Sequence, residues 1–195
     1  MMEAPAAGEK TDFDNLGEDK VAMTAAESSE VRSYPTSMGF CITSFFWMGV
    51  ATFMGLLGAT ELMAPDLLEN VGWLVFGRVR PIHVNLVLFG FVTPGLMAAA
   101  FYYLPKLLQT DLFSEKLGLA TVFLWNLVLV AAVVSLMAGF TQGREYAELI
   151  WPVDIGIVAV FVLVLINMVM TVWRRKEPVL YVSIWYACDD VVLSR

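Results

Sequence analysis

Four long stretches of this chain contain no Asp, Glu, Lys or Arg, and they constrain the fold more than any other feature. They cover residues 33–60, 81–105, 117–143 and 155–173. About 20 mainly apolar residues in a helix cross the hydrocarbon core of a bilayer, and a single segment in lipid can pair its own backbone groups only as a helix. The sequence therefore predicts an all-α polytopic membrane protein with four transmembrane helices at about 38–61, 82–104, 118–140 and 154–173.

The composition excludes the main alternatives. The chain is 58% hydrophobic and 16% charged, whereas a soluble domain averages about 45–50% and about 25%. A disordered chain would be poor in apolar residues. The net charge is −7, and the one cluster of basic residues is the short run at 174–176. We therefore expect a lipid bilayer around the chain and no nucleic-acid partner.

Both ends of the sequence differ from the predicted membrane domain, which we assign to residues 37–195. Residues 1–36 are acidic and without apolar periodicity, and they lack the basic start and apolar core of a signal peptide. We expect them to form a disordered cytoplasmic tail. The apolar run 179–188 spans only about half a bilayer and is followed by Asp189 and Asp190. It reads as the stub of a fifth helix.

The distribution of Lys and Arg predicts the orientation. If the N-terminus is inside, the basic residues near 32, 106–116 and 174–176 lie on the same side and outnumber those in the two opposite loops. Short cytoplasmic loops carry an excess of Lys and Arg. We therefore expect a cytoplasmic N-terminus, with loops 62–81 and 141–153 outside.

His83 is the one histidine of the chain, and it follows Arg78, Arg80 and Pro81. Proline favours the first turn of a helix, so His83 is expected near the outer start of the second span. A neutral imidazole can bind a metal or a haem iron, and the arginines could pair with anionic groups such as haem propionates. The alternative is a polar interfacial histidine beside two solvated arginines.

A few other polar residues lie within the spans. Asn85 is two residues past His83 and therefore faces another side of the helix. Asn126 and Asn167 are expected to lie deep in their spans, where hydrogen bonds between helices are the favoured role and a polar pathway is the alternative. Pro94 is expected to bend the second span.

The loop at 141–148 is predicted to lie on the same side of the membrane as His83. Its carboxylates Glu145 and Glu148 are three residues apart. Such a pair could bind a hard cation, but the spacing is equally typical of an ordinary loop.

Three blocks of sequence resemble subunit I of the haem–copper oxidases, most closely the cbb3-type cytochrome c oxidase. FGRVRPIHVNLVLFGF at 76–91 resembles the second helix of that family, and TQGREYAELIWPVDI at 141–155 resembles the loop after its third helix. RRKEPVLYVSIWY at 174–186 resembles the entry to its fifth helix. The blocks occur in family order, and the resemblance covers about residues 36–186.

The resemblance implies specific roles. His83 matches the axial ligand of low-spin haem b, and Arg80 and Arg78 match arginines near the haem propionates. Glu145 and Glu148 match a loop that approaches a calcium ion. Val84 departs from the family, which usually has threonine there, and Thr93-Pro94 replaces a small, glycine-rich segment.

The resemblance also implies a setting. The family fold has about twelve helices, and its high-spin haem, its copper and the second ligand of the low-spin haem are held by histidines of later helices. The implied partners are those remaining helices of subunit I and c-type cytochrome subunits, in the bacterial cytoplasmic (inner) membrane.

The function implied is that of the N-terminal portion of a respiratory terminal oxidase subunit. In that family, electrons from cytochrome c pass through haem b, and O2 is reduced to water with proton uptake. With one histidine, the chain is expected to be inactive alone, as a truncated or frameshifted product would be. Two alternatives stay open: a relative of the nitric-oxide reductase large subunit, and a non-enzymatic four-helix membrane scaffold.

Overall fold

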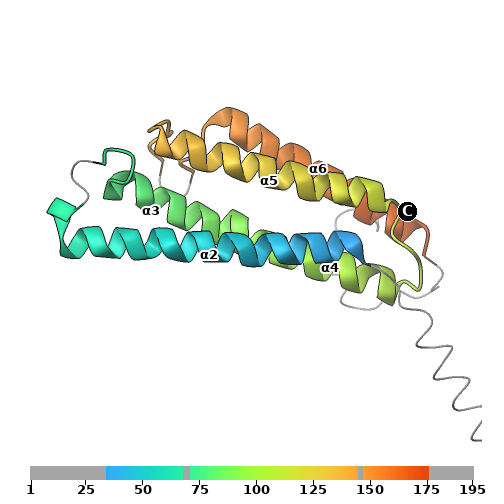
Figure 1. The fold of residues 1–195 in the computed structure, drawn as a ribbon. Coiled ribbons are helices and arrows are strands. Elements are labelled where there is room, and N and C mark those ends of the chain that lie inside the picture. Colours follow the sequence, from blue (N-terminus) through green and yellow to red (C-terminus); the bar gives the residue numbers. More distant parts are fainter. Residues whose placement is uncertain (1–33, 68–70, 145–146, 176–195) are drawn as a thin grey trace, which may run out of the picture. The chain divides into compact units, whose positions relative to one another are not determined.

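The computed structural model describes residues 34–67, 71–144 and 147–175, and within them the regular secondary structure is entirely helical (Figure 1). The tail before residue 34 and the predicted stub at 179–188 lie outside this part of the chain. The helices are α2 (Pro35–Met63), η1 (Pro65–Leu67), α3 (Phe76–Asn85), the π-helical η2 (Leu86–Val92), α4 (Thr93–Leu107), α5 (Glu115–Met137) and α6 (Trp151–Trp173).

Four helical spans are long and apolar enough to cross a membrane, as predicted. They are α2, the continuous run α3–η2–α4 over Phe76–Leu107, α5 and α6. Their outer faces carry large apolar side chains such as Phe45, Phe123 and Leu165, each more than half exposed. Exposed apolar faces of this extent suit helices that are surrounded by lipid or by other apolar helices.

The second span begins earlier than expected. The sequence predicts a start at 82 with Pro81 in the first turn, but α3 begins at Phe76 and Pro81 lies inside it. The prediction was wrong because it treated Arg78 and Arg80 as loop residues. Arg78 is tolerated in the helix because its guanidinium donates a hydrogen bond to the Met137 carbonyl, at 2.7 Å. His83 is consequently the eighth residue of α3 rather than a first-turn residue.

The other helix ends lie within three residues of the prediction, and the last one, at Trp173, agrees with it; the differences have local causes. At the start of α5, the Ser114 hydroxyl accepts a hydrogen bond from Leu117 N, which caps the helix. At its end, Gly139 has a φ of +88°, which favours glycine. Phe140 N and Gly139 N donate to the carbonyls of Ser135 and Leu136. This Schellman arrangement ends the helix at Met137.

The π-helical segment η2 ends at Val92, two residues before Pro94. Proline has no N–H, so it cannot donate to the Phe89 carbonyl five residues back. The indole Nε1–H of Trp125 donates to this carbonyl instead, at 3.0 Å. Ser44 Oγ similarly donates to the Phe91 carbonyl, at 2.8 Å. Side chains of α5 and α2 therefore satisfy carbonyls where the second span departs from α-helical geometry.

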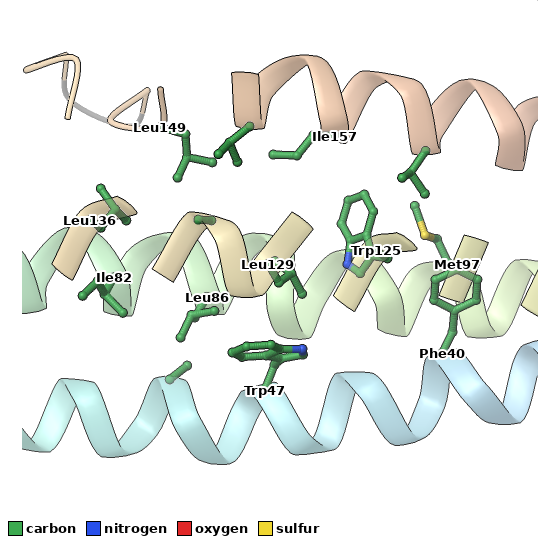
Figure 2. Close-up of a cluster of buried hydrophobic side chains, with 14 of the residues drawn as sticks. Phe40, Trp47, Ile82, Leu86, Met97, Trp125, Leu129, Leu136, Leu149 and Ile157 are labelled. Carbon is green, nitrogen blue, oxygen red and sulfur yellow. The ribbon is translucent and has the colours of Figure 1, made fainter. Parts of the chain in front are cut away.

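The buried core runs between the spans (Figure 2). Helix α2 packs along α3, η2 and α4, while α5 packs on α6 and also contacts α2. Trp47 of α2 and Trp125 of α5 are both almost fully buried. A Cβ added at Gly90 would lie 2.8 Å from Trp47 Cβ, so glycine allows the close approach of α2 and η2.

The two asparagines within the spans make hydrogen bonds between elements. Asn126 accepts from Trp47 Nε1 at 2.9 Å and donates to Thr43 Oγ1 at 2.9 Å, which confirms the predicted bond between helices. Asn167 bonds instead to the loop before α5, where it accepts from Ser114 N and donates to Ser114 O. Asn167 lies near the end of α6, where a loop rather than another helix lies beside it.

Candidate functional site

Helix α3 carries the candidate residues and directs them to three different neighbours. His83 contacts α2, Arg78 contacts the end of α5, and Asn85 contacts Glu148 in the segment before α6. The structure therefore brings the residues to one helix but does not gather them around one point.

The His83 imidazole is held against α2 by one hydrogen bond. Its Nδ1 lies 2.8 Å from the carbonyl oxygen of Ala51. A carbonyl only accepts, so Nδ1 is the nitrogen that donates, and in a neutral ring Nε2 then carries the lone pair. Within the described residues, this is the one hydrogen bond of the ring. A metal-binding histidine is commonly fixed through its other nitrogen in this way.

Gly55 lies one turn beyond Ala51 in α2 and faces the same ring. A Cβ added at Gly55 would lie 2.8 Å from both Cε1 and Nδ1 of His83. Neither Gly55 nor the Ala51 carbonyl was identified from the sequence. The spacing of residues along α3 carries no information about which turn of α2 it meets.

Arg78 is anchored to the C-terminus of α5. Besides its bond to the Met137 carbonyl, its guanidinium lies beside Gly139, where an added Cβ would be 3.0 Å from one terminal nitrogen. A cation at a helix C-terminus interacts favourably with the helix dipole. Arg80, two residues further on, is exposed, so the two arginines occupy different environments.

Glu148 is buried and paired with α3. Its Oε2 accepts a hydrogen bond of 3.1 Å from Asn85 Nδ2, which also donates to the Pro81 carbonyl at 2.9 Å. Asn85 thus faces a different side from His83, as predicted. Glu145 lies outside the described residues. Among those that are described, no group of three or more His, Cys, Asp or Glu is placed to hold a metal ion.

Glu61, near the C-terminal end of α2, was also missed by the sequence analysis. Its Oε2 is the one solvent-shielded side-chain polar atom without a hydrogen-bond partner in the part of the chain that the structure describes. It continues the buried side of α2 that includes Met54 and Gly58. Glu61 is a single acidic residue at the end of a long apolar stretch. The sequence alone therefore indicated no role for it.

Comparisons with known proteins give the family. Residues 36–193 match the model of the family described as cytochrome C and quinol oxidase polypeptide I. A cbb3-type cytochrome c oxidase subunit CcoN1 from Stutzerimonas stutzeri is 38% identical over 159 residues, which cover 82% of this chain and 34% of that protein. A cytochrome c oxidase subunit 1 from Rhodobacter capsulatus is 38% identical over 154 residues, covering 77% and 29% respectively.

The matched region includes α3 and the second, third and fourth spans completely, and α2 from its second residue onward. The chain spans about a third of the length of these curated relatives. The all-helical membrane architecture and the match over most of the chain agree with each other. This chain is therefore a multi-pass membrane protein that belongs to the cytochrome c and quinol oxidase polypeptide I family, the haem–copper oxidases.

Proposed function

We propose that this chain provides an axial ligand of low-spin haem b in a respiratory haem–copper oxidase, and that His83 is this ligand. The observation that carries the proposal is the hydrogen bond from His83 Nδ1 to the Ala51 carbonyl. It leaves Nε2 with a lone pair in a ring whose orientation is fixed by α2. Iron binding requires such a neutral nitrogen, so the donor fits the group that the family uses.

Arginines on the same helix would hold the propionates. Arg80 is exposed and three residues before His83, and its planar guanidinium suits a carboxylate. Arg78 uses one nitrogen for the Met137 carbonyl and has further N–H donors for a second contact. Positive charge near the group would also stabilise its more electron-rich state, which is one way a protein sets a redox potential.

Glu145 and Glu148 are proposed as carboxylates near a calcium ion beside the propionates. Support comes from Glu148, whose side chain is buried and held to α3 by Asn85. Carboxylate oxygens are the ligands that calcium prefers. Because Asn85 lies two residues from His83, α3 links the position of this loop to that of the proposed haem ligand.

The wider proposal concerns the assembled enzyme. Haem and copper are the cofactors of the family, and haem b, when bound, supplies reversible one-electron transfer. The chain has one histidine, so any further imidazole ligands lie outside these 195 residues. We propose that its partners are the other helices of subunit I and c-type cytochrome subunits, that it lies in the bacterial inner membrane with a cytoplasmic N-terminus, and that its part in O2 reduction requires them.

The test is haem binding to the purified chain. We express the 195 residues in bacterial membranes, purify them in detergent, titrate with haem b and record the visible spectrum. Wild type is expected to bind with a spectrum typical of imidazole ligation. His83→Gly is expected to lose it, and added imidazole to restore it, because the free ligand enters the space left by the side chain. Rescue separates ligation from folding.

Two results would contradict the proposal. One is a wild-type chain that gives no His83-dependent spectrum. The other is a His83→Gly variant that binds haem with unchanged affinity and spectrum. Gly49→Ala serves as the matched control, since an added Cβ there has no neighbour within 4 Å, and it is expected to behave as wild type.

A further inference from the structure

We infer that Gly55 is a positioning residue for His83: its missing side chain lets the imidazole lie on α2, so that Nδ1–H reaches the Ala51 carbonyl and Nε2 is kept as the ligand nitrogen. The meaning of this role for haem rests on the proposed function. The geometry itself does not, because it concerns only α2 and α3.

The His83 ring has little free space on the side of α2. A Cβ at Gly55 would lie 2.8 Å from Cε1, 2.8 Å from Nδ1 and 3.4 Å from Nε2 of His83. The first two distances are shorter than real Cβ contacts, so the ring or the helix would have to move. Gly55 therefore contacts the imidazole over one edge, including the nitrogen that makes the hydrogen bond.

The ring cannot move and keep its hydrogen bond. His83 has only two side-chain torsions, and Nδ1 is 2.8 Å from the Ala51 carbonyl, one turn from Gly55 on the same helix. Ala51 is 1% exposed, so water does not readily replace the imidazole at this carbonyl. Moving the ring away from a new methyl group would lengthen the bond and release the constraint on the tautomer.

The other glycines of α2 show that this arrangement is specific to one position. Gly49 has no neighbour within 4 Å of an added Cβ. At Gly58 the nearest atom is Val79 Cγ1 at 3.6 Å, an ordinary contact, and at Gly39 the nearest atoms belong to Val122 at 3.3 Å. Among the four glycines of this helix, Gly55 alone faces a group that can bind a metal.

The single histidine makes the test direct. Selective isotope labelling of histidine gives one imidazole in the spectrum of the 195-residue chain, and nitrogen chemical shifts distinguish Nδ1–H from Nε2–H. Without haem, wild type is expected to show the Nδ1–H tautomer. Gly55→Ala is expected to lose this single state and show the Nε2–H form or a mixture. Gly49→Ala and Gly58→Ala are expected to retain the wild-type signal.

A second measurement connects the tautomer to ligand binding. In the haem titration, Gly55→Ala is expected to raise the dissociation constant by roughly 10-fold or more, which is typical when a metal ligand loses its outer hydrogen bond. Circular dichroism and gel filtration confirm that the variant is folded. If it is not folded, the tautomer measured directly in wild type still tests the assignment of the proton to Nδ1.

The outcomes separate the inference from the proposed function. An Nε2–H tautomer in wild type, or an unchanged Nδ1–H tautomer in folded Gly55→Ala, overturns the positioning role whatever haem does. Loss of the Nδ1–H state in Gly55→Ala, together with haem binding that does not depend on His83, supports the packing role and overturns the proposed function alone.

Discussion

The two ends of the helical bundle differ in how completely their polar side chains are paired. At the end where α2 begins and α6 ends, here called the Asn167 end, polar groups bond to each other and to the loop before α5. Thr36 donates to Glu115, Asn167 makes two bonds to the Ser114 backbone, and Thr171 accepts from Phe113 N. Asn167, Thr171 and Thr36 are all almost fully buried.

The opposite end, called the His83 end, contains α3, the C-terminus of α5 and the start of α6. Here Glu61 Oε2 has no hydrogen-bond partner among the described residues, and the His83 ring makes one hydrogen bond through one nitrogen. Closed networks stabilise a fold, whereas unused donors and acceptors are frequent at binding sites. The comparison predicts that the Asn167 end controls stability and the His83 end controls ligand binding.

The largest expected effect is at Asn167. Asn167→Leu leaves the Ser114 N–H without its partner in a buried place and removes one of the two donors to the Ser114 carbonyl, which keeps its bond from Gly118 N. We expect a loss of about 3 kcal/mol in the free energy of unfolding, at the upper end of the roughly 1–3 kcal/mol that an unsatisfied buried group costs. Denaturation by sodium dodecyl sulfate in mixed micelles measures it. The haem spectrum of the folded fraction should be unchanged, and a changed spectrum would show that the two ends are not independent.

Gly118→Ala is expected to have the next largest effect. An added Cβ would lie 2.7 Å from Thr36 Cγ2 and 2.9 Å from Thr36 Cβ, and Thr36 is 1% exposed. Overpacking of this kind costs about 1–3 kcal/mol. The same denaturation experiment measures it, with Gly49→Ala as the control. Equal stability of the two variants would mean that the contact of α2 with α5 at Thr36 can relax.

Arg78→Met tests the His83 end. It removes the hydrogen bond to the Met137 carbonyl and the cation at the α5 C-terminus. We expect a loss of about 1 kcal/mol, less than at Asn167, because the side chain is half-buried and water can partly replace it. Arg78→Lys is expected to retain part of this energy. A loss as large as that of Asn167→Leu would contradict the division between the ends.

The smallest expected effect on folding is that of Glu148→Gln. The glutamine amide oxygen can still accept from Asn85 Nδ2, so the hydrogen bond is retained. We therefore expect the free energy of unfolding to change by no more than about 0.5 kcal/mol. Calcium binding, measured by calorimetry on the haem-loaded chain, is expected to weaken because a charge is lost. Calcium affinity equal to that of wild type would remove Glu148 from the proposed ion site.

The sequence was sufficient for the four spans because hydropathy adds up over about 20 residues and does not depend on tertiary contacts. Helix ends were less predictable. Arg78 appeared to exclude residues 76–81 from the second span, and only the Met137 carbonyl explains why it does not. The identity of His83 as the candidate ligand followed from its being the one histidine and from the resemblance around it.

The surroundings of His83 could not be predicted in the same way. Ala51 is 32 residues away, and Asn85 and Glu148 are 63 residues apart. Which residues meet depends on how each helix is rotated about its axis, and a span that is apolar on all sides gives no periodicity from which to read that rotation. Gly55 was uninformative for the same reason, since a glycine in a span can mark any close contact.

The π-helical segment η2 also sets how the two halves of the second span are rotated relative to each other. Buried positions occur every four residues from Ile82 through Leu86 and Gly90 to Pro94. At 100° per residue, three such steps in an α-helix would turn the buried stripe by about 120°, and the wider π turn absorbs this rotation. The segment thus compensates for the rotation of the buried stripe about the helix axis between the two halves of the span. A single-residue deletion in it is expected to restore α-helical geometry and to turn His83 away from Ala51, so the length of this segment in this chain determines which turn of α2 the imidazole meets.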